Sequence, residues 1–286
     1  MLPAQLGELT ELTSLDLSEN NLDMNSESNL ATLCSLTRLR TLNLTAAVAD
    51  LPVAALERMA QLPELSGLQA ETNELFLEEQ HFQALQRWPA LAELSLGQND
   101  ITLTPASRAA LAGLDRLRIL FLHDNPLDLE PDLTGWTRLE RLDLEQTGIA
   151  QWPNGLTDLM NQQPLALRAV DLSSNQLRHV PDLRDTAFAA SVRAGEGDFY
   201  YSFQNNPLDA QALQSLNDAG SPPKRKRMRW AGSPIFHNRC AITFLKPLVH
   251  LNGNRCTSCS TAWRIPSNTT AARTPCAGAC RPCSSN

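Results

Sequence analysis

The residues best suited to acid–base chemistry lie near the middle of the chain. His123 and Asp124 are adjacent, and Asp143 follows about one repeat later, a combination that could transfer protons. No motif places a serine or cysteine nucleophile beside them, and no glycine-rich phosphate loop is present. Because a repetitive fold sets charged side chains side by side without a catalytic role, we predict no catalytic residue, no metal site and no cofactor.

A second group of reactive residues is the set of cysteines near the C-terminus. Cys256-x2-Cys259 is followed, after sixteen residues, by Cys276-x3-Cys280-x2-Cys283, which is close to the spacing of zinc sites. The surrounding residues are Ser, Thr, Arg, Pro and Ala without hydrophobic periodicity. We therefore favour a tail without metal, and a zinc-binding tail that contacts nucleic acid is the alternative.

Charge also divides the chain near residue 220. All 31 acidic residues precede Ser221, together with 13 of the 24 basic residues, so the first part carries a formal charge of −18 and the remainder +11. The run KRKRMR at 224–229 is interpreted as a solvated linker, with nuclear import or binding to an anionic surface as the alternatives. Such asymmetry indicates two parts with different roles.

The elements that must position these residues are repeats. Eight segments fit L-x-x-L-x-L-x-x-N-x-L, and their Asn positions are spaced by 27, 26, 26, 26, 22, 28 and 31 residues. Asn amides there can bond backbone groups as the chain turns away from a strand, which predicts a structural ladder. Ala47 and Thr147 replace two of the amides, and at Ala47 we expect irregular structure with water as a substitute partner. The predicted ladder is Asn20, Asn73, Asn99, Asn125, Asn175 and Asn206.

This period predicts an α/β solenoid, a leucine-rich-repeat horseshoe with a parallel concave sheet. Helical spacing is expected at 51–59 and 82–88, a capped helix near 104–111, and only a turn or 3₁₀ segment at 130–133. We predict one repeat domain over residues 1–220, with about eight repeats and a terminal helical cap at 209–219. We expect the basic, Cys-rich tail at 221–286 to be poorly ordered or read out of frame, and the N-terminal end to be truncated.

Alternate strand residues should point out of the concave face. Acids outnumber bases there, which predicts a protein partner with a basic surface and disfavours nucleic acid on this face. Phe121 is the candidate anchor, although it could instead pack along the sheet. The alternative for the acids is that they only maintain solubility. The predicted partner-binding residues are Asp16, Glu19, Glu71, Glu93, Phe121, His123, Asp124, Asp143, Glu145, Asp171 and Tyr200.

No segment of this sequence has the pattern of a secretory signal or a membrane span. Met1 is not followed by a basic and then a long apolar region, and no stretch approaches 18 consecutive apolar residues. We expect a monomer without membrane contact that is either cytoplasmic or a secreted effector exported without a cleaved signal.

Four stretches carry a resemblance to a known family: LSLGQND from Leu94, LRILFLHDNPL from Leu117, VDLSSNQLRHVPDL from Val170 and FQNNPLDAQALQSLNDAG from Phe203. The repeat region resembles bacterial leucine-rich-repeat effectors that continue into a novel-type E3 ubiquitin ligase domain. That resemblance implies that the repeats select a substrate and that a downstream helical domain carries a catalytic Cys-x-Asp motif.

The tail departs from this family because it contains no Asp. We therefore expect a protein–protein interaction module, the substrate-recognition repeats of an effector whose catalytic domain is missing, and not an enzyme. The alternative is an E3 ubiquitin-protein ligase that acts through a tail cysteine.

Overall fold

The computed structural model describes residues 1–195, 199–219 and 241–243. They form successive coils in which each of the eight repeats supplies one three-residue strand to a single parallel sheet. Residues 241–243 add a ninth strand, and the order is β8-β7-β6-β5-β4-β3-β2-β1-β9. The strands are β1 (Ser14–Asp16), β2 (Thr41–Asn43), β3 (Gly67–Gln69), β4 (Glu93–Ser95), β5 (Ile119–Phe121), β6 (Arg141–Asp143), β7 (Ala169–Asp171), β8 (Tyr200–Ser202) and β9 (Ala241–Thr243).

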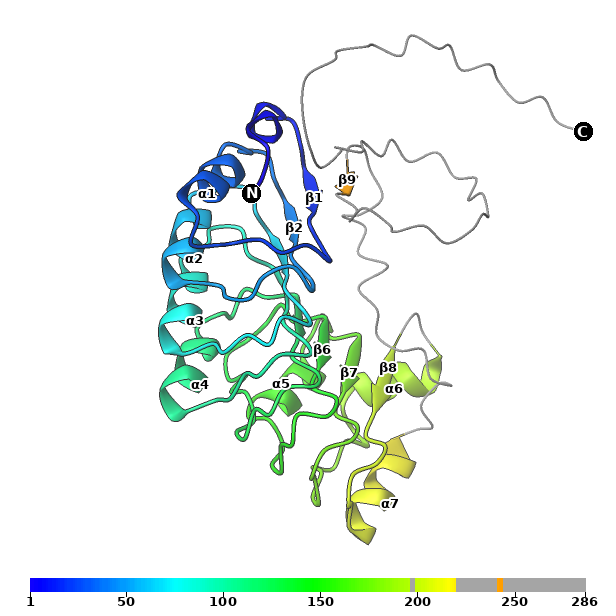
Figure 1. Cartoon of the computed structure of the whole chain (residues 1–286). Helices are drawn as coiled ribbons and strands as arrows, with labels where there is room; N and C mark the ends of the chain where they lie inside the picture. Colours follow the sequence, from blue (N-terminus) through cyan, green and yellow to red (C-terminus); the bar gives the residue numbers. More distant parts are fainter. Residues whose placement is uncertain (196–198, 220–240, 244–286) are drawn as a thin grey trace, which may run out of the picture.

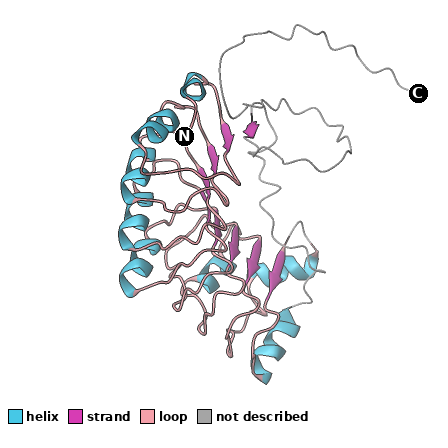
Figure 2. Cartoon of the chain, in the orientation of Figure 1, coloured by secondary structure: helices cyan, strands magenta, loops and turns pink. Residues whose placement is uncertain are grey.

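Helices cover the outer side of the sheet (Figure 1), and turns connect the two layers (Figure 2). The helices are η1 (Ala4–Glu8), α1 (Glu27–Cys34), α2 (Val53–Met59), α3 (Glu79–Gln86), α4 (Pro105–Ala112), α5 (Leu156–Asn161), α6 (Ala187–Ala194) and α7 (Ala210–Ala219). This arrangement confirms the predicted horseshoe of leucine-rich repeats. Of the predicted tail, the structure describes only 241–243, and the cysteines proposed as zinc ligands lie outside the described residues.

Local sequence explains where the helices begin. The Thr104 hydroxyl accepts from the Ser107 backbone N–H at 3.1 Å, while the Ser107 hydroxyl accepts from the Thr104 backbone N–H at 2.8 Å. Pro105 occupies the first turn, where no backbone N–H is required. Between β5 and β6 the described chain has no helix, as expected for the 22-residue spacing.

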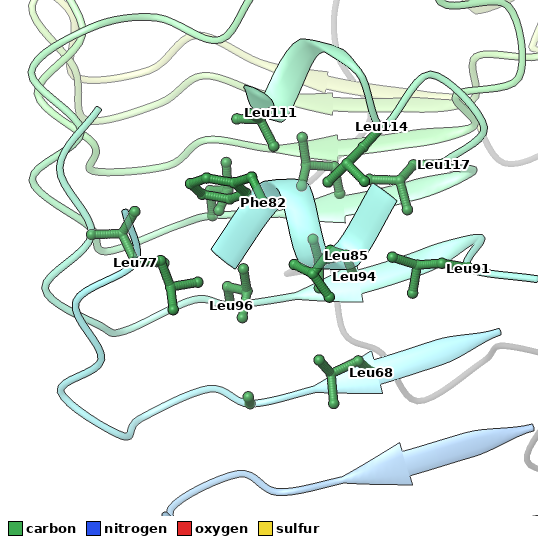
Figure 3. Close-up of a cluster of buried hydrophobic side chains, with 14 of the residues drawn as sticks. Leu68, Leu77, Phe82, Leu85, Leu91, Leu94, Leu96, Leu111, Leu114 and Leu117 are labelled. Atoms are coloured by element: carbon green, nitrogen blue, oxygen red, sulfur yellow. The ribbon is translucent and has the colours of Figure 1, made fainter. Parts of the chain in front are cut away.

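The core is one continuous column of aliphatic side chains. Leu15, Leu42, Leu68 and Leu94 pair in register on successive strands, and each is at most 1% exposed. Figure 3 shows how leucines from the strands and from α3 and α4 meet in the space between the layers. Because each coil shares its apolar faces with both neighbours, one repeat would not be stable alone.

The Asn side chains tie each coil to the one before it. Asn99 donates to the carbonyl oxygens of Leu96 and Ala70, both at 2.9 Å, and its own oxygen accepts from the backbone N–H of Leu75 at 3.0 Å. The same cross-repeat bonds recur at Asn73, Asn125, Asn175 and Asn206. Asn20 bonds the carbonyl oxygens of its own turn.

At the two ladder positions that lack Asn, a backbone carbonyl replaces the side-chain oxygen as the acceptor from the preceding coil. The N–H of Leu22 donates to the carbonyl oxygen of Ala47 at 2.7 Å, and the N–H of Leu127 donates to the carbonyl oxygen of Thr147 at 3.1 Å. Leu22 also forms a parallel bridge with Val48. A backbone carbonyl one repeat away thus satisfies the N–H of Leu22, the donor for which a water was expected to substitute.

The residue before each ladder position adopts a left-handed conformation. All eight have φ between 51° and 60° and none is glycine: Glu19, Ala46, Thr72, Gln98, Asp124, Gln146, Ser174 and Asn205. This conformation turns the chain sharply out of the strand, and it costs about 1–2 kcal/mol for a residue with a Cβ. The tight turn at each coil thus imposes a recurrent local cost that the shared core must offset.

Candidate functional site

The concave face is a regular grid of side chains. Parallel pairing in register stacks one residue from each strand into a central column of Asp16, Asn43, Gln69, Ser95, Phe121, Asp143, Asp171 and Ser202. Two residues further along each repeat, the same alternation gives an outer column of Ser18, Thr45, Glu71, Gly97, His123, Glu145, Ser173 and Gln204. Every residue predicted to bind a partner lies on this grid or directly beside it.

The middle of the grid is more enclosed than the sequence pattern suggests. Glu93, Phe121, Asp143 and Asp171, all expected to be exposed, are between 1% and 5% exposed. Neighbouring strands lie only about 4.8 Å apart, so a side chain on one strand covers those on the next. The prediction that these four side chains are exposed was therefore wrong.

Several central residues also bond their own backbone. Asp16, Asp143 and Asp171 each accept from the backbone N–H two residues later, at 2.9–3.0 Å, and Asn43 does the same. The Tyr200 hydroxyl donates to the other oxygen of Asp171 at 3.0 Å. These acids fix the exit of the strand, a structural role that sequence analysis missed although the D-x-S and D-x-E spacing signals it.

Asp143 has the most unusual environment on this face. Burial, with the nearby charges of Asp171, Glu145 and Asp124 adding to it, raises the pKa of Asp143 to about 8, although the N–H of Glu145 opposes this shift. Its Oδ2 lies 3.8 Å from Nδ1 of His123, too far for a hydrogen bond. The carboxyl group is therefore mostly neutral at pH 7, which suits a structural role better than a charged contact.

His123 is held in place by its neighbours on the grid. Its ring meets Phe121 edge-on, with the ring centroids 6.5 Å apart. The ring also lies so close over Gly97 that a Cβ at position 97 would overlap Cε1 of His123. Gly97 thus provides the space that the imidazole fills. The predicted proximity of His123 and Asp143 is correct, and no nucleophile motif accompanies them.

The accessible charge lies at the outer edge of the grid. We define the acidic rim as Glu19, Glu71, Asp124 and Glu145, which come from the outer column and from the adjacent left-handed residues. All four are exposed or half-buried. No Arg or Lys occupies the outer column or the left-handed positions. Glu19 and Asp124 were predicted as partner-binding residues, but the left-handed conformation that they share with the other residues before the ladder positions was not predicted.

The described residues contain no group of three His, Cys, Asp or Glu side chains placed to hold a metal ion. No helix within them is long and apolar enough to cross a lipid bilayer. What the grid offers chemically is an ordered set of carboxylates and amides, suited to contacting a positively charged surface.

Comparisons with known proteins bear on the fold. No protein-family model matches the chain, and no curated protein matches its sequence. The chain is similar to a leucine-rich repeat protein from Bacteroides thetaiotaomicron, with 17% identity over 73% of this chain and 26% of that one and a TM-score of 0.50. At this identity the likeness supports the fold alone.

Two further solved structures are of the same kind. A leucine-rich repeat protein from Leptospira interrogans has 19% identity over 76% of this chain and 61% of that one, with a TM-score of 0.48. Internalin C2 from Listeria monocytogenes has 21% identity over 71% and 74%, with a TM-score of 0.46. The chain therefore spans less than two thirds of the Leptospira protein and about a quarter of the Bacteroides protein.

Proposed function

We propose that this chain is a protein-binding module that recognises a basic protein surface through the acidic rim. The observation that carries the proposal is the charge of the accessible edge, where four acids and no Arg or Lys line the exits of eight strands. Exposed carboxylates attract cationic side chains and repel the phosphates of nucleic acids. Association should accordingly be fast at low salt and should weaken as the salt concentration rises.

The proposal assigns different roles to the predicted binding residues. Glu19, Glu71, Asp124, Glu145 and His123 are available for direct contact. Phe121, Asp143, Asp171 and Glu93 are buried, so they shape the face without contributing large exposed area. Asp16 and Tyr200 are half-buried and each takes part in bonds on the grid.

The biological setting that we propose follows from the family resemblance of the repeats. In it, the chain is the monomeric substrate-recognition part of a bacterial effector, cytoplasmic or exported without a cleaved signal, and it has no catalytic activity of its own. The ligase alternative has no support in the described residues, since no Cys-x-Asp sequence occurs anywhere in the chain.

The test compares three forms of the full chain in capture experiments at about 0.15 M salt. The first is unchanged, the second carries Glu71→Gln, Asp124→Asn and Glu145→Gln, and the third carries Glu8→Gln, Asp115→Asn and Asp158→Asn at exposed positions away from the rim. We expect a basic partner to be retained by the first and third forms and lost by the second. Equal capture by all three, or capture of an acidic partner, would contradict the proposal.

A further inference from the structure

Two polar side chains in the middle of the concave face approach each other without bonding. Oδ2 of Asp143 and Nδ1 of His123 lie 3.8 Å apart, and Nδ1 has no hydrogen-bond partner among the described residues. Asp143 accepts from the N–H of Glu145 through Oδ1, whereas no described residue donates to Oδ2. The side chains of Asp143 and His123 are 7% and 20% exposed, so the pair is not sealed from the concave side.

A cationic nitrogen fits the gap between these two atoms. Placed about 2.9 Å from both, it could direct one N–H to Oδ2 and one to Nδ1, with the imidazole proton on Nε2. A cation also stabilises the ionised form of a carboxyl group that burial otherwise keeps protonated. Water could donate to both atoms but carries no charge, so it would leave Asp143 neutral. The arrangement therefore favours a positively charged donor.

The charges around Asp143 also favour a cation. The titratable or charged side chains at the concave positions of its own coil and of the two neighbouring coils are His123, Asp124, Arg141, Glu145 and Asp171. The three acids among them add to burial in raising the pKa of Asp143 to about 8. Since they outnumber the one Arg, the surroundings are negative even while Asp143 is protonated.

The neighbouring strand indicates what kind of cation fits. Asp171 pairs in register with Asp143, on a strand about 4.8 Å away. It accepts three hydrogen bonds, two from Ser173 and one from Tyr200, and a carboxylate can accept about four. A planar guanidinium with five donors can reach both carboxyl groups, whereas an ammonium group acts as a single point of charge.

An enclosed hydroxyl one strand further on is consistent with a ligand here. Ser202 pairs in register with Asp171 in the central column and is 3% exposed. Its Oγ has no hydrogen-bond partner among the described residues. Buried polar atoms without partners are rare in folded proteins. The Ser202 hydroxyl can bond the backbone of a ligand whose side chain lies over Asp171 and Asp143.

We propose that the gap between Asp143 and His123 binds one arginine side chain of the basic partner, with its guanidinium reaching from Asp143 to Asp171. This inference rests on the proposed function and names the partner residue that the most enclosed acids recognise. When the arginine binds, Asp143 releases its proton to solvent, and a carboxylate–guanidinium pair replaces the neutral carboxyl group. Affinity should therefore rise with pH up to about 8.

The experiment titrates the full chain with the blocked peptide Gly-Gly-Arg-Gly-Gly and with versions that carry Lys or neutral citrulline in place of Arg. NMR spectra report binding at the His123 ring and at the Glu145 amide, and calorimetry in two buffers reports proton release. We expect the Arg peptide to shift both signals, to release close to one proton at pH 7, and to bind more tightly than the Lys peptide. The citrulline peptide should not bind. Affinity for Arg should rise at least about tenfold from pH 6.5 to 8.5.

Two variants locate the effect. Asp143→Asn should weaken Arg binding at least about fivefold at pH 8.5, since it leaves a neutral group opposite the cation. Any pH dependence left in this variant belongs to His123, whose protonation also repels a cation. Asp16→Asn is the matched control, because Asp16 occupies the same column and bonds its own strand exit in the same way, but it pairs with Asn43. Its affinity for the peptide should be unchanged.

Four outcomes would overturn the proposal: no shift at His123, equal binding of the Arg and Lys or citrulline peptides, affinity that does not change with pH, or equal weakening by Asp143→Asn and Asp16→Asn. Proton release is measured on the unchanged chain, so the test does not depend on how well a variant folds. The capture experiment leaves Asp143 and Asp171 intact. A basic partner retained there, with no Arg peptide bound here, would refute this site and leave the proposed function standing.

Discussion

The backbone N–H of Leu22 donates to the carbonyl oxygen of Ala47, which lies one full coil further along the chain, at 2.7 Å. In coils that keep the amide, the side-chain oxygen of the ladder Asn accepts from the equivalent N–H, as Asn99 does from Leu75 at 3.0 Å. The fold therefore tolerates a missing amide only where the backbone has moved close enough to replace it. The first prediction follows from this difference.

Replacing Asn99 with Ala should lower the free energy of unfolding by about 2–4 kcal/mol, since several buried donors and acceptors lose their partner at once. Urea unfolding followed by circular dichroism measures the change. Gln61→Ala, a truncation at an exposed position, is the control and should shift the midpoint very little. A loss below about 0.5 kcal/mol at Asn99 would show that the ladder is not needed there.

Thr72→Asn should raise the free energy of unfolding by about 0.5–1 kcal/mol. Thr72 has φ of 58°, a conformation that a β-branched residue adopts at particular cost and that Asn tolerates well. Thr102→Asn is the matched control, because Thr102 is exposed and has no positive φ. Denaturant midpoints of the two variants should move apart, and equal midpoints would refute the strain argument.

The stability of the protein should fall as the pH rises from 5 to 8. Asp143 has a pKa of about 8 when folded and close to 3.9 when unfolded, so between these values the native state binds the extra proton and loses stability as the proton is released. Asp143→Asn keeps the acceptor for the N–H of Glu145 but has no proton to lose, so its stability should be less dependent on pH.

Thermal unfolding of the wild type and Asp143→Asn at pH 5, 6, 7 and 8 tests this prediction. His123, Asp124, Glu145 and Asp171 are unchanged in the comparison. Asp182→Asn is the control, because the pKa of Asp182 is lowered to about 2 beside Arg184 and its charge is constant over this range. If the wild type and Asp143→Asn show the same pH slope, Asp143 is ionised in the folded protein.

Gly97→Ala should destabilise the protein by about 1–3 kcal/mol and should displace the imidazole of His123, because the added methyl group would overlap the ring. The ring resonances of His123 in NMR spectra report the displacement directly. Gly113→Ala is the comparison, since the methyl group there meets the end of the flexible Gln86 side chain and the cost should be smaller. An unchanged His123 signal would mean that the ring is not held by this contact.

The fold could be predicted because the repeating leucines and Asn residues act in the same way in every coil. Leu94 is buried, and the residues paired with it on the neighbouring strands are also leucines, so the sequence of its own repeat is enough to predict its burial. On the concave face, the exposure of a side chain depends instead on the side chains that the two neighbouring strands place at the paired position. The exposure of Asp143 and Phe121 could not be read from their own repeats, because adjacent coils enclose them.

The candidate site was predicted in outline for a similar reason. Alternation along each strand placed Glu71, His123 and Glu145 on the correct side of the sheet. The left-handed turn that adds Asp124 to the rim is set by backbone geometry, and no residue type at that position demands it. The replacement of the amide at Ala47 by a carbonyl also depends on a backbone shift that the sequence pattern does not encode.

The outer layer is interrupted between α4 and α5, where the chain from β5 to β6 makes turns and no helix. Helices α1 to α4 pack in succession, as do α5 to α7. A curved rod that is thinner at one section bends most easily there. We therefore expect the solenoid to bend most easily between Asp124 and Glu145. A bound macromolecule of different curvature could be accommodated by bending at this section, while the repeats on either side of it keep their shape.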